Sequence, residues 1–231
     1  MLQAWTLTER RATRGFGPSG SFSLIEVHDP SDSFPPELVV SQAIGAQNQR
    51  YRLPRSSFDE FAKARPARVA DGYGREYTEF GDRIGPWQLD GETLWFGKTF
   101  YDGEGNTGVG GFGYFDTTRR EFRVFTSPAI ADSSVSALLV QPDAIWLALF
   151  RRGEYGDSGS GLVRFDRRTE VFQPFEIGDE IVRGFAPVGD VLVLATDQGI
   201  TVLNHNEVRR YIVDQTTDGR LRVAPEIRYF I

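Results

Sequence analysis

The chain has 231 residues, no cysteine and a formal net charge of −6, from 26 basic and 32 acidic side chains. Because the basic residues form no run longer than a pair, the sequence argues against a nucleic-acid or anionic-membrane partner. The lack of cysteine excludes disulfide bonds, a thiolate nucleophile and zinc sites of the cysteine type. The 18 Phe, 8 Tyr, 4 Trp and 25 Gly favour strands and tight turns.

The first part of the chain, residues 1–83, fits a regular strand repeat poorly, and we interpret it as degenerate repeat units. Strands are predicted at Ala4–Thr8, Phe22–His28 and Leu38–Ala43. Ser57 followed by Glu60 is a capping-box pattern, which predicts one short helix near residues 57–65 that ends before Pro66.

Two stretches that follow repeat each other about fifty residues apart. Phe100, Gly103, Glu104, Gly111, Phe115 and Asp116 recur as Phe150, Gly153, Glu154, Gly161, Phe165 and Asp166. A third copy, Val191–Asn204, keeps the apolar strand and the spacing from glycine to Asx. A period of this length predicts a stacked or radial repeat architecture, because one such unit cannot bury its apolar face alone. We place the units at residues 84–126, 135–177 and 182–214.

Each of these units contains four short strand patterns separated by turn residues, which is typical of a propeller blade. The first unit has Pro86–Leu89, Thr93–Thr99, Gly111–Phe115 and Phe122–Phe125. The second has Val135–Val140, Ala144–Phe150, Gly161–Phe165 and Val171–Phe175. The third has Val182–Pro187, Val191–Thr196, Gly199–Leu203 and Val208–Val213. Trp95 and Trp146 recur at one position of this pattern, which predicts that both are core residues.

The C-terminal residues 218–231 contain two further strand patterns, Leu221–Val223 and Ile227–Ile231, which we expect to close a ring against the N-terminal segment. We therefore predict that residues 1–231 form a single all-β domain, a β-propeller of five blades with four antiparallel strands each. Since no segment reaches the ~18 apolar residues of a membrane-spanning helix, we expect a soluble chain without membrane insertion. Such a chain is either cytoplasmic or a mature exported protein.

The first unit contains the segments Leu94–Gly97, Gly113–Asp116 and Phe122–Phe125, and the second contains Ile145–Trp146, Gly161–Asp166 and Val171–Phe175. In these segments the repeat resembles that of two-component-regulator-type propellers, whose blades read roughly L-W-x-G, then G-L-x-x-F/Y-D, then F-x-x-F/Y. In the third unit Leu192–Val193 replaces the Leu-Trp pair. The resemblance covers residues 84–214 and implies a propeller, but it carries over no catalytic residue.

Two long loops, Tyr101–Gly110 and Arg151–Ser160, join equivalent strands and should lie on one face of a propeller. Acidic and aromatic groups on such a face suit sugar or cation binding, although glycine-rich polar loops are also ordinary solvated connectors. Trp87 is a further aromatic candidate, because it does not recur in the repeat. The predicted ligand-binding residues are Trp87, Tyr101, Asp102, Glu104, Glu154 and Tyr155.

The first loop also begins like a calcium site, with Asp102, Glu104 and Asn106 as oxygen donors at alternate positions. Thr107 replaces the glycine that an EF-hand requires, so the sequence predicts at most a looser calcium site. No other cofactor is expected. The G-x-G-x-x-G pattern in the same loop leads into a strand, rather than into a helix that could hold a pyrophosphate.

The sequence leaves three functions open. The first is a non-enzymatic binding or sensory module whose long-loop face takes a small molecule, a glycan or a protein segment. The second is a glycosidase-like hydrolase with axial carboxylates, for which Asp132, Asp179 and Glu180 lie between the units. The third is a fragment of a larger propeller that acts as an interaction scaffold and self-associates through its edge strands.

Overall fold

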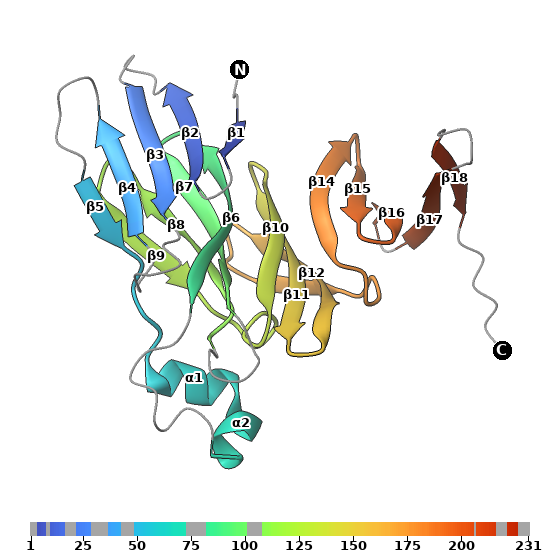
Figure 1. The fold of residues 1–231 in the computed structure, drawn as a ribbon, viewed down its shortest axis with the longest axis horizontal. Helices are drawn as coiled ribbons and strands as arrows, with labels where there is room; N and C mark the ends of the chain where they lie inside the picture. Colours follow the sequence, from blue (N-terminus) through green and yellow to red (C-terminus); the bar gives the residue numbers. More distant parts are fainter. Residues whose placement is uncertain are drawn as a thin grey trace.

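The computed structural model describes the backbone of residues 4–7, 10–16, 22–28, 37–42, 49–72, 82–100, 108–205, 207–215 and 221–225. Side chains are described in residues 51–72, 82–100, 108–205 and 207–213. In this part of the chain the fold is all-β, with antiparallel sheets that follow one another along the sequence and two short helices (Figure 1). Neither helix is long and apolar enough to cross a membrane.

The N-terminal sheet contains five antiparallel strands in chain order. They are β1 (Ala4–Leu7), β2 (Arg10–Phe16), β3 (Phe22–His28), β4 (Glu37–Gln42) and β5 (Gln49–Arg52). The strand predictions near β1, β3 and β4 are confirmed, whereas β2 and β5 were not predicted. The segment before the first repeat therefore holds one five-stranded sheet.

Helices α1 (Phe58–Ala64) and α2 (Pro66–Ala70) follow this sheet. The capping box predicted at the start of α1 is present, because the Ser57 hydroxyl accepts a hydrogen bond from the Glu60 backbone N–H at 3.2 Å. The Ser57 backbone N–H donates in turn to the Glu60 carboxylate at 2.7 Å. Helix α1 ends before Pro66, as predicted, but Pro66 also begins α2, because the first residue of a helix needs no N–H.

Three further sheets correspond to the three predicted repeats. The first contains β6 (Arg83–Asp90), β7 (Thr93–Thr99), β8 (Phe112–Asp116) and β9 (Glu121–Phe125). The second contains β10 (Ser134–Val140), β11 (Ala144–Gly153), β12 (Gly156–Asp166) and β13 (Phe172–Phe175). The third contains β14 (Val182–Val188), β15 (Val191–Thr196), β16 (Gly199–Asn204), β17 (Glu207–Gln215) and β18 (Leu221–Pro225).

The strand register shows which residues are equivalent in the three repeats. Leu94 pairs with Phe115, Ile145 with Phe165, and Leu192 with Leu203, and all six side chains are buried. The adjacent pairs are Trp95 with Tyr114, Trp146 with Arg164, and Val193 with Val202. Because side chains alternate along a strand, these adjacent pairs lie on the opposite face of each sheet.

The sheets pack face to face, with one apolar cluster in each interface. Tyr51 and Leu53 pack against Leu94, Phe96 and Phe115 of the β6–β9 sheet. The clusters that join β6–β9 to β10–β13, and β10–β13 to β14–β18, are built in the same way. The face that carries Trp95 thus meets the face that carries Ile145, and the face that carries Trp146 meets the face that carries Leu192. The core is therefore a series of layers between consecutive sheets.

The prediction that Trp95 and Trp146 are core residues is confirmed for Trp95 and in part for Trp146. Trp95 is 6% exposed and stacks on Phe112, with ring centroids 6.1 Å apart. Trp146 is half-buried in the next interface, where its ring lies 5.2 Å from that of Phe175 and its indole N–H donates to Gln141 at 3.1 Å. Both rings therefore join one sheet to the next.

Strand β18 pairs with β17 as the outermost strand of the last sheet. Among the described strands it has no pairing with the N-terminal sheet, and Figure 1 draws it at the side of the molecule away from β1–β5. The predicted strand Ile227–Ile231 lies outside the described residues. Four sheets are described, so five blades and a closed ring stay predictions.

The turn after β12 is held by Asp166. Its carboxylate accepts hydrogen bonds from the backbone N–H groups of Thr169 at 2.8 Å and Arg168 at 3.0 Å, and from the Thr169 hydroxyl at 2.9 Å. The Thr169 N–H, followed by its hydroxyl, holds the pKa of Asp166 below its ordinary value of 3.8, because hydrogen bonds favour the charged carboxylate.

A carboxyl group whose pKa is lowered by folding adds stability above its ordinary pKa, and that stability is lost as the pH falls through the lowered value. We expect carbon-detected NMR titration to place the Asp166 midpoint below 3.8. Thr169→Val keeps the backbone N–H but removes the hydroxyl, so it should raise the midpoint partway. A midpoint at or above 3.8 in the parent chain would contradict this description of the turn.

Candidate functional site

Segments that are distant in the sequence meet at the end of the sheets that carries helix α1 (Figure 1). Val109, which precedes β8, packs against Phe61 of α1. The Gly110 N–H donates to the Ala131 carbonyl at 2.8 Å, and a Cβ at Gly110 would overlap the carbonyl of Ile130. We call this region, made of α1, residues 108–111, residues 127–133 and the tip of the β11–β12 hairpin, the helical end.

The segment predicted as the second long loop, Arg151–Ser160, is a β-hairpin instead. Strands β11 and β12 continue to the pair Gly153 with Gly156, so only Glu154 and Tyr155 form the turn. Gly156 has a φ of 131°, which only glycine adopts readily, and this permits the short turn. Arg152 and Asp157 form a cross-strand ion pair at 3.5 Å, which further favours the extended hairpin.

The hairpin tip carries two of the predicted ligand-binding residues. Tyr155 is 97% exposed, and Glu154 is also exposed. At the base of the tip, Arg151 forms an ion pair with Asp132. The Asp132 carbonyl accepts a hydrogen bond from Arg65 at 3.2 Å, and Arg65 lies over the ring of Phe100. The hairpin is thus connected by charged contacts to the residue that separates α1 from α2.

Other predicted site residues are distributed differently. Tyr101, Asp102, Glu104 and Asn106 lie outside the described residues, so their convergence with the hairpin and the calcium site stay predictions. Trp87 lies in β6 rather than at the helical end, where it is half-buried against the cluster of Leu94 and Phe96. Its indole N–H is buried and has no hydrogen-bond partner among the described residues. The structure therefore does not bring Trp87 together with Glu154 and Tyr155.

A buried polar cluster near the helical end was missed in the sequence. Lys98 Nζ lies 2.8 Å from Asp82 Oδ2 and donates to Ser56 Oγ at 2.9 Å, while the Ser56 hydroxyl donates to Asp82. Asp82 also accepts the Val109 N–H at 2.7 Å. The Lys98 and Asp82 side chains are each 2% exposed. The cluster ties the segment before α1 to β7 and to the segment before β8, so it positions the helical end.

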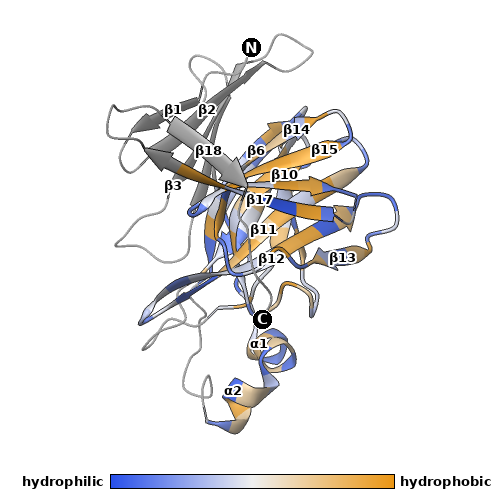
Figure 2. Cartoon of the chain, turned by 90° about the vertical axis from the view of Figure 1, so that its right-hand side faces the viewer, coloured by the Kyte–Doolittle hydropathy of each residue, from blue (hydrophilic) through white to orange (hydrophobic). Residues whose placement is uncertain are grey.

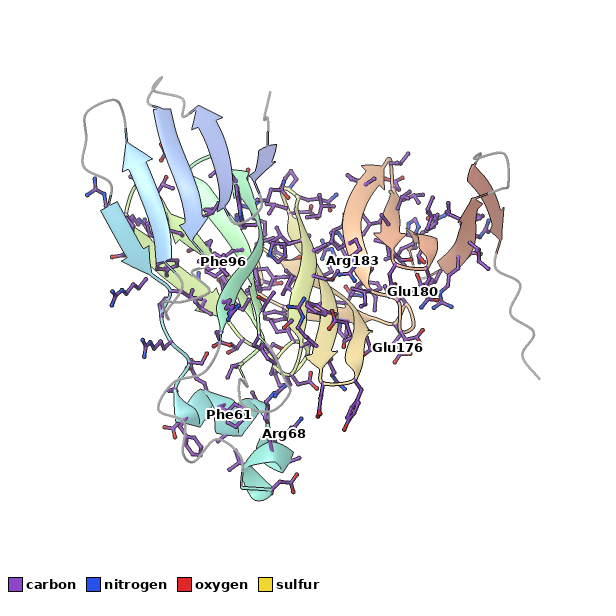
Figure 3. The ribbon with its side chains drawn as sticks, viewed as in Figure 1. Phe61, Arg68, Phe96, Glu176, Glu180 and Arg183 are labelled. Carbon is purple, nitrogen blue, oxygen red and sulfur yellow. The ribbon has the colours of Figure 1, made fainter. Side chains whose placement is uncertain are left out.

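A second buried ion pair holds the segment that links the last two sheets. Glu180, which precedes β14 (Figure 3), pairs with Arg210 of β17 and accepts a hydrogen bond from the Thr201 hydroxyl at 2.7 Å. Arg210 also donates to the carbonyl of Ile177. The neighbouring residue Asp179 accepts the Gly159 N–H through its backbone carbonyl at 2.8 Å. The three carboxylates considered for a hydrolase therefore do not share one open site.

These contacts limit the chemistry of the described site. Among the residues whose side chains are described, the buried carboxylates are those of Asp82 and Glu180. Each is paired with a cation, and a paired, covered carboxylate is poorly placed to act on a substrate. Among the residues that the structure describes, no group of three His, Cys, Asp or Glu side chains could hold a metal ion. The helical end presents to solvent the outer side of α1 and the charged hairpin, whose terminal Tyr155 is 97% exposed.

Neither a family model nor a curated protein matches this sequence. Two solved structures of the extracellular domain of BT4673 from B. thetaiotaomicron match it, one described as a one-component system and the other as a hybrid two-component system. They show 10% and 12% identity over 97% and 96% of this chain, each with a TM-score of 0.30. The chain spans 37% and 36% of the length of those structures. Similarity this low does not establish a common fold.

Proposed function

We propose that the chain is a non-enzymatic binding module that takes its ligand at the helical end. The observation that carries this proposal is the β11–β12 hairpin. Its last residue pairs extend beyond the neighbouring strands, because β10 begins opposite Phe150 and β13 ends opposite Leu162. A protruding two-stranded ribbon with an almost fully exposed tyrosine at its tip is suited to recognition, since tyrosine combines a large apolar ring with a hydroxyl group.

The ligand that this ribbon fits best is an extended protein segment. Beyond Phe150 no described strand pairs with the outer edge of β11, so the backbone groups that face this edge, which belong to every second residue, can pair with an added strand. Arg151 and Arg152 flank this edge. Each is paired with an acidic residue of the chain, Asp132 and Asp157, and the remaining N–H groups of their guanidinium groups can contact acidic side chains of such a segment. A glycan or a small molecule would instead need the predicted acidic loop of Asp102 and Glu104.

Two further parts of the proposal rest on sequence patterns. One is the calcium site of Asp102, Glu104 and Asn106. The other is that residues 1–231 form one propeller-type domain of five blades, which needs one sheet more than the four described. The chain-order stacking of antiparallel sheets supports a propeller-type arrangement. The hydrolase alternative has less support, because Glu180 is buried against Arg210 and Asp132 is paired with Arg151.

The proposal predicts that Tyr155→Ala removes binding without loss of stability. Peptides selected from a display library against the parent chain should bind the variant at least about tenfold more weakly, which corresponds to about 1.4 kcal/mol. Because Tyr155 is 97% exposed, the melting temperature should stay unchanged. Val171→Ala, at another exposed apolar residue, is the matched control and should leave binding intact. Equal binding of the selected peptides to Tyr155→Ala and to the parent would refute the assignment of the hairpin tip.

A further inference from the structure

The last sheet has an apolar face that no described sheet covers. In β15, Val191, Val193 and Ala195 alternate with Leu192 and Leu194, which are buried against the β10–β13 sheet. The alternating residues therefore lie on the other side, which we call the open face. The cross-strand neighbours of Val191 and Val193 extend it: Ala186, Val188, Val202 and Asn204. Val188 is 62% exposed, and Figure 2 colours much of β14 and β15 as hydrophobic.

The equivalent positions in the other two repeats are covered by a following sheet. The pair Val193–Val202 corresponds to Trp95–Tyr114 and to Trp146–Arg164. Trp95 and Tyr114 pack on the β10–β13 sheet, and Trp146 packs on the β14–β18 sheet. An apolar face that is a packing face in two repeats and uncovered in the third indicates a missing partner sheet, since one such unit cannot bury its face alone.

We propose that this partner is a second copy of the chain, which packs its own open face against the first across a two-fold axis. Within each chain, the sheet faces that pack against Trp95 and Trp146 are already buried. Among the described side chains, the apolar face that a second copy leaves available is therefore its own open face. The face is suited to pairing with itself, because it consists mainly of small aliphatic residues. Its charged neighbours, Glu207 and Arg209 of β17, compensate each other at 2.9 Å within one chain.

The size of the face is close to what such a dimer needs. The four strands β14–β17, about 4.8 Å apart and about six residues long at about 3.3 Å a residue, span about 19 by 20 Å. The accessible surface of a side-chain layer exceeds this projected area. The accessible surface of the open face therefore approaches the ~800 Å² that each partner of a standard specific interface buries. The two sheets would lie about 10 Å apart, as the sheets of a sandwich do.

Sedimentation equilibrium and chemical cross-linking together test the proposal. We expect the parent chain to sediment at twice its mass of 25.9 kDa. The double variant Val193→Glu/Val202→Glu should sediment as a monomer, because the dimer would bury four like charges. Since the chain contains no cysteine, Val193→Cys with a short bis-maleimide should give a covalent dimer. Val171→Glu and Val171→Cys are the matched controls, and neither should change the mass or cross-link.

The outcomes separate the possible occupants of the open face. A parent chain that stays monomeric across the whole concentration range would overturn the dimer and favour a further sheet of a longer chain as the occupant. A dimer that persists in the double variant would place the interface elsewhere, for example along the edge of β18. If circular dichroism shows that the double variant is unfolded, Val188→Asp replaces it, because Val188 is 62% exposed and its substitution leaves the buried clusters intact.

Discussion

Lys98→Leu should destabilise the fold by ~3–5 kcal/mol, because it leaves the buried Asp82 carboxylate without its cation. Removing one partner of a buried ion pair costs far more than the pair itself contributes, since the remaining charge cannot be solvated. The change leaves a side chain of suitable shape, because Leu149 stands at the equivalent position of the next repeat and is buried. Chemical denaturation followed by circular dichroism measures the loss.

The double variant Lys98→Leu/Asp82→Asn is the control for this prediction. Asparagine removes the charge, its Oδ1 can still accept the Val109 N–H, and its Nδ2 in place of Oδ2 can donate to the Ser56 hydroxyl oxygen, which has lost the Lys98 donor. Most of the lost stability should therefore return. If the double variant is less stable than Lys98→Leu, the cost does not come from an uncompensated charge, and the assigned role of Lys98 is wrong.

Trp95→Ala should cost a similar amount, ~3–5 kcal/mol, because it opens a cavity between the β6–β9 and β10–β13 sheets. Trp95 lies against Phe112, and Phe112 in turn contacts Phe125 and Phe165. Arg167 also lies over the Trp95 ring, with its guanidinium carbon 5.3 Å from the centroid. The indole N–H of Trp95 is buried without a hydrogen-bond partner among the described residues, so it contributes no polar stabilisation.

The unpaired indole N–H of Trp95 supplies the control for this prediction. Trp95→Phe keeps much of the ring and removes the unpaired donor, so it should cost much less than Trp95→Ala. Thermal and chemical unfolding of both variants, with the exposed Tyr155→Ala as a reference, measures the difference. Equal losses for Phe and Ala would show that the indole nitrogen has a partner that the contacts do not reveal.

The repeat made most of the fold predictable from the sequence. Strands β7 and β15 have the predicted bounds, and the other strands of the three repeat sheets differ from their predictions mainly at the ends. In each repeat the apolar residues of a strand are followed by turn residues. The strand pattern and the turn pattern are two independent signals, and they predict the same strand bounds. Strand β2 was missed because its sequence, RRATRGF, has neither an apolar alternation nor a β-branched run.

The site was predicted less well. The hairpin segment 151–160 contains three glycines and several polar residues, which are typical of a loop, and the pairing of Arg152 with Asp157 becomes visible only in the strand register. The cluster of Ser56, Asp82 and Lys98 combines residues 26 and 42 positions apart. One feature of the sequence pointed to this cluster, because Lys98 stands at the position where the next repeat has Leu149.

The strict chain order of the sheets has a consequence for the history of the protein. Every described ladder of backbone hydrogen bonds joins strands of the same sheet, and neighbouring sheets contact each other mainly through side chains. A gene duplication that adds one unit of about 50 residues therefore breaks no ladder, and it needs only a new apolar face to match the old one. The weakened tryptophan position in the third repeat, Val193, shows how far such a copy can diverge while its sheet still forms.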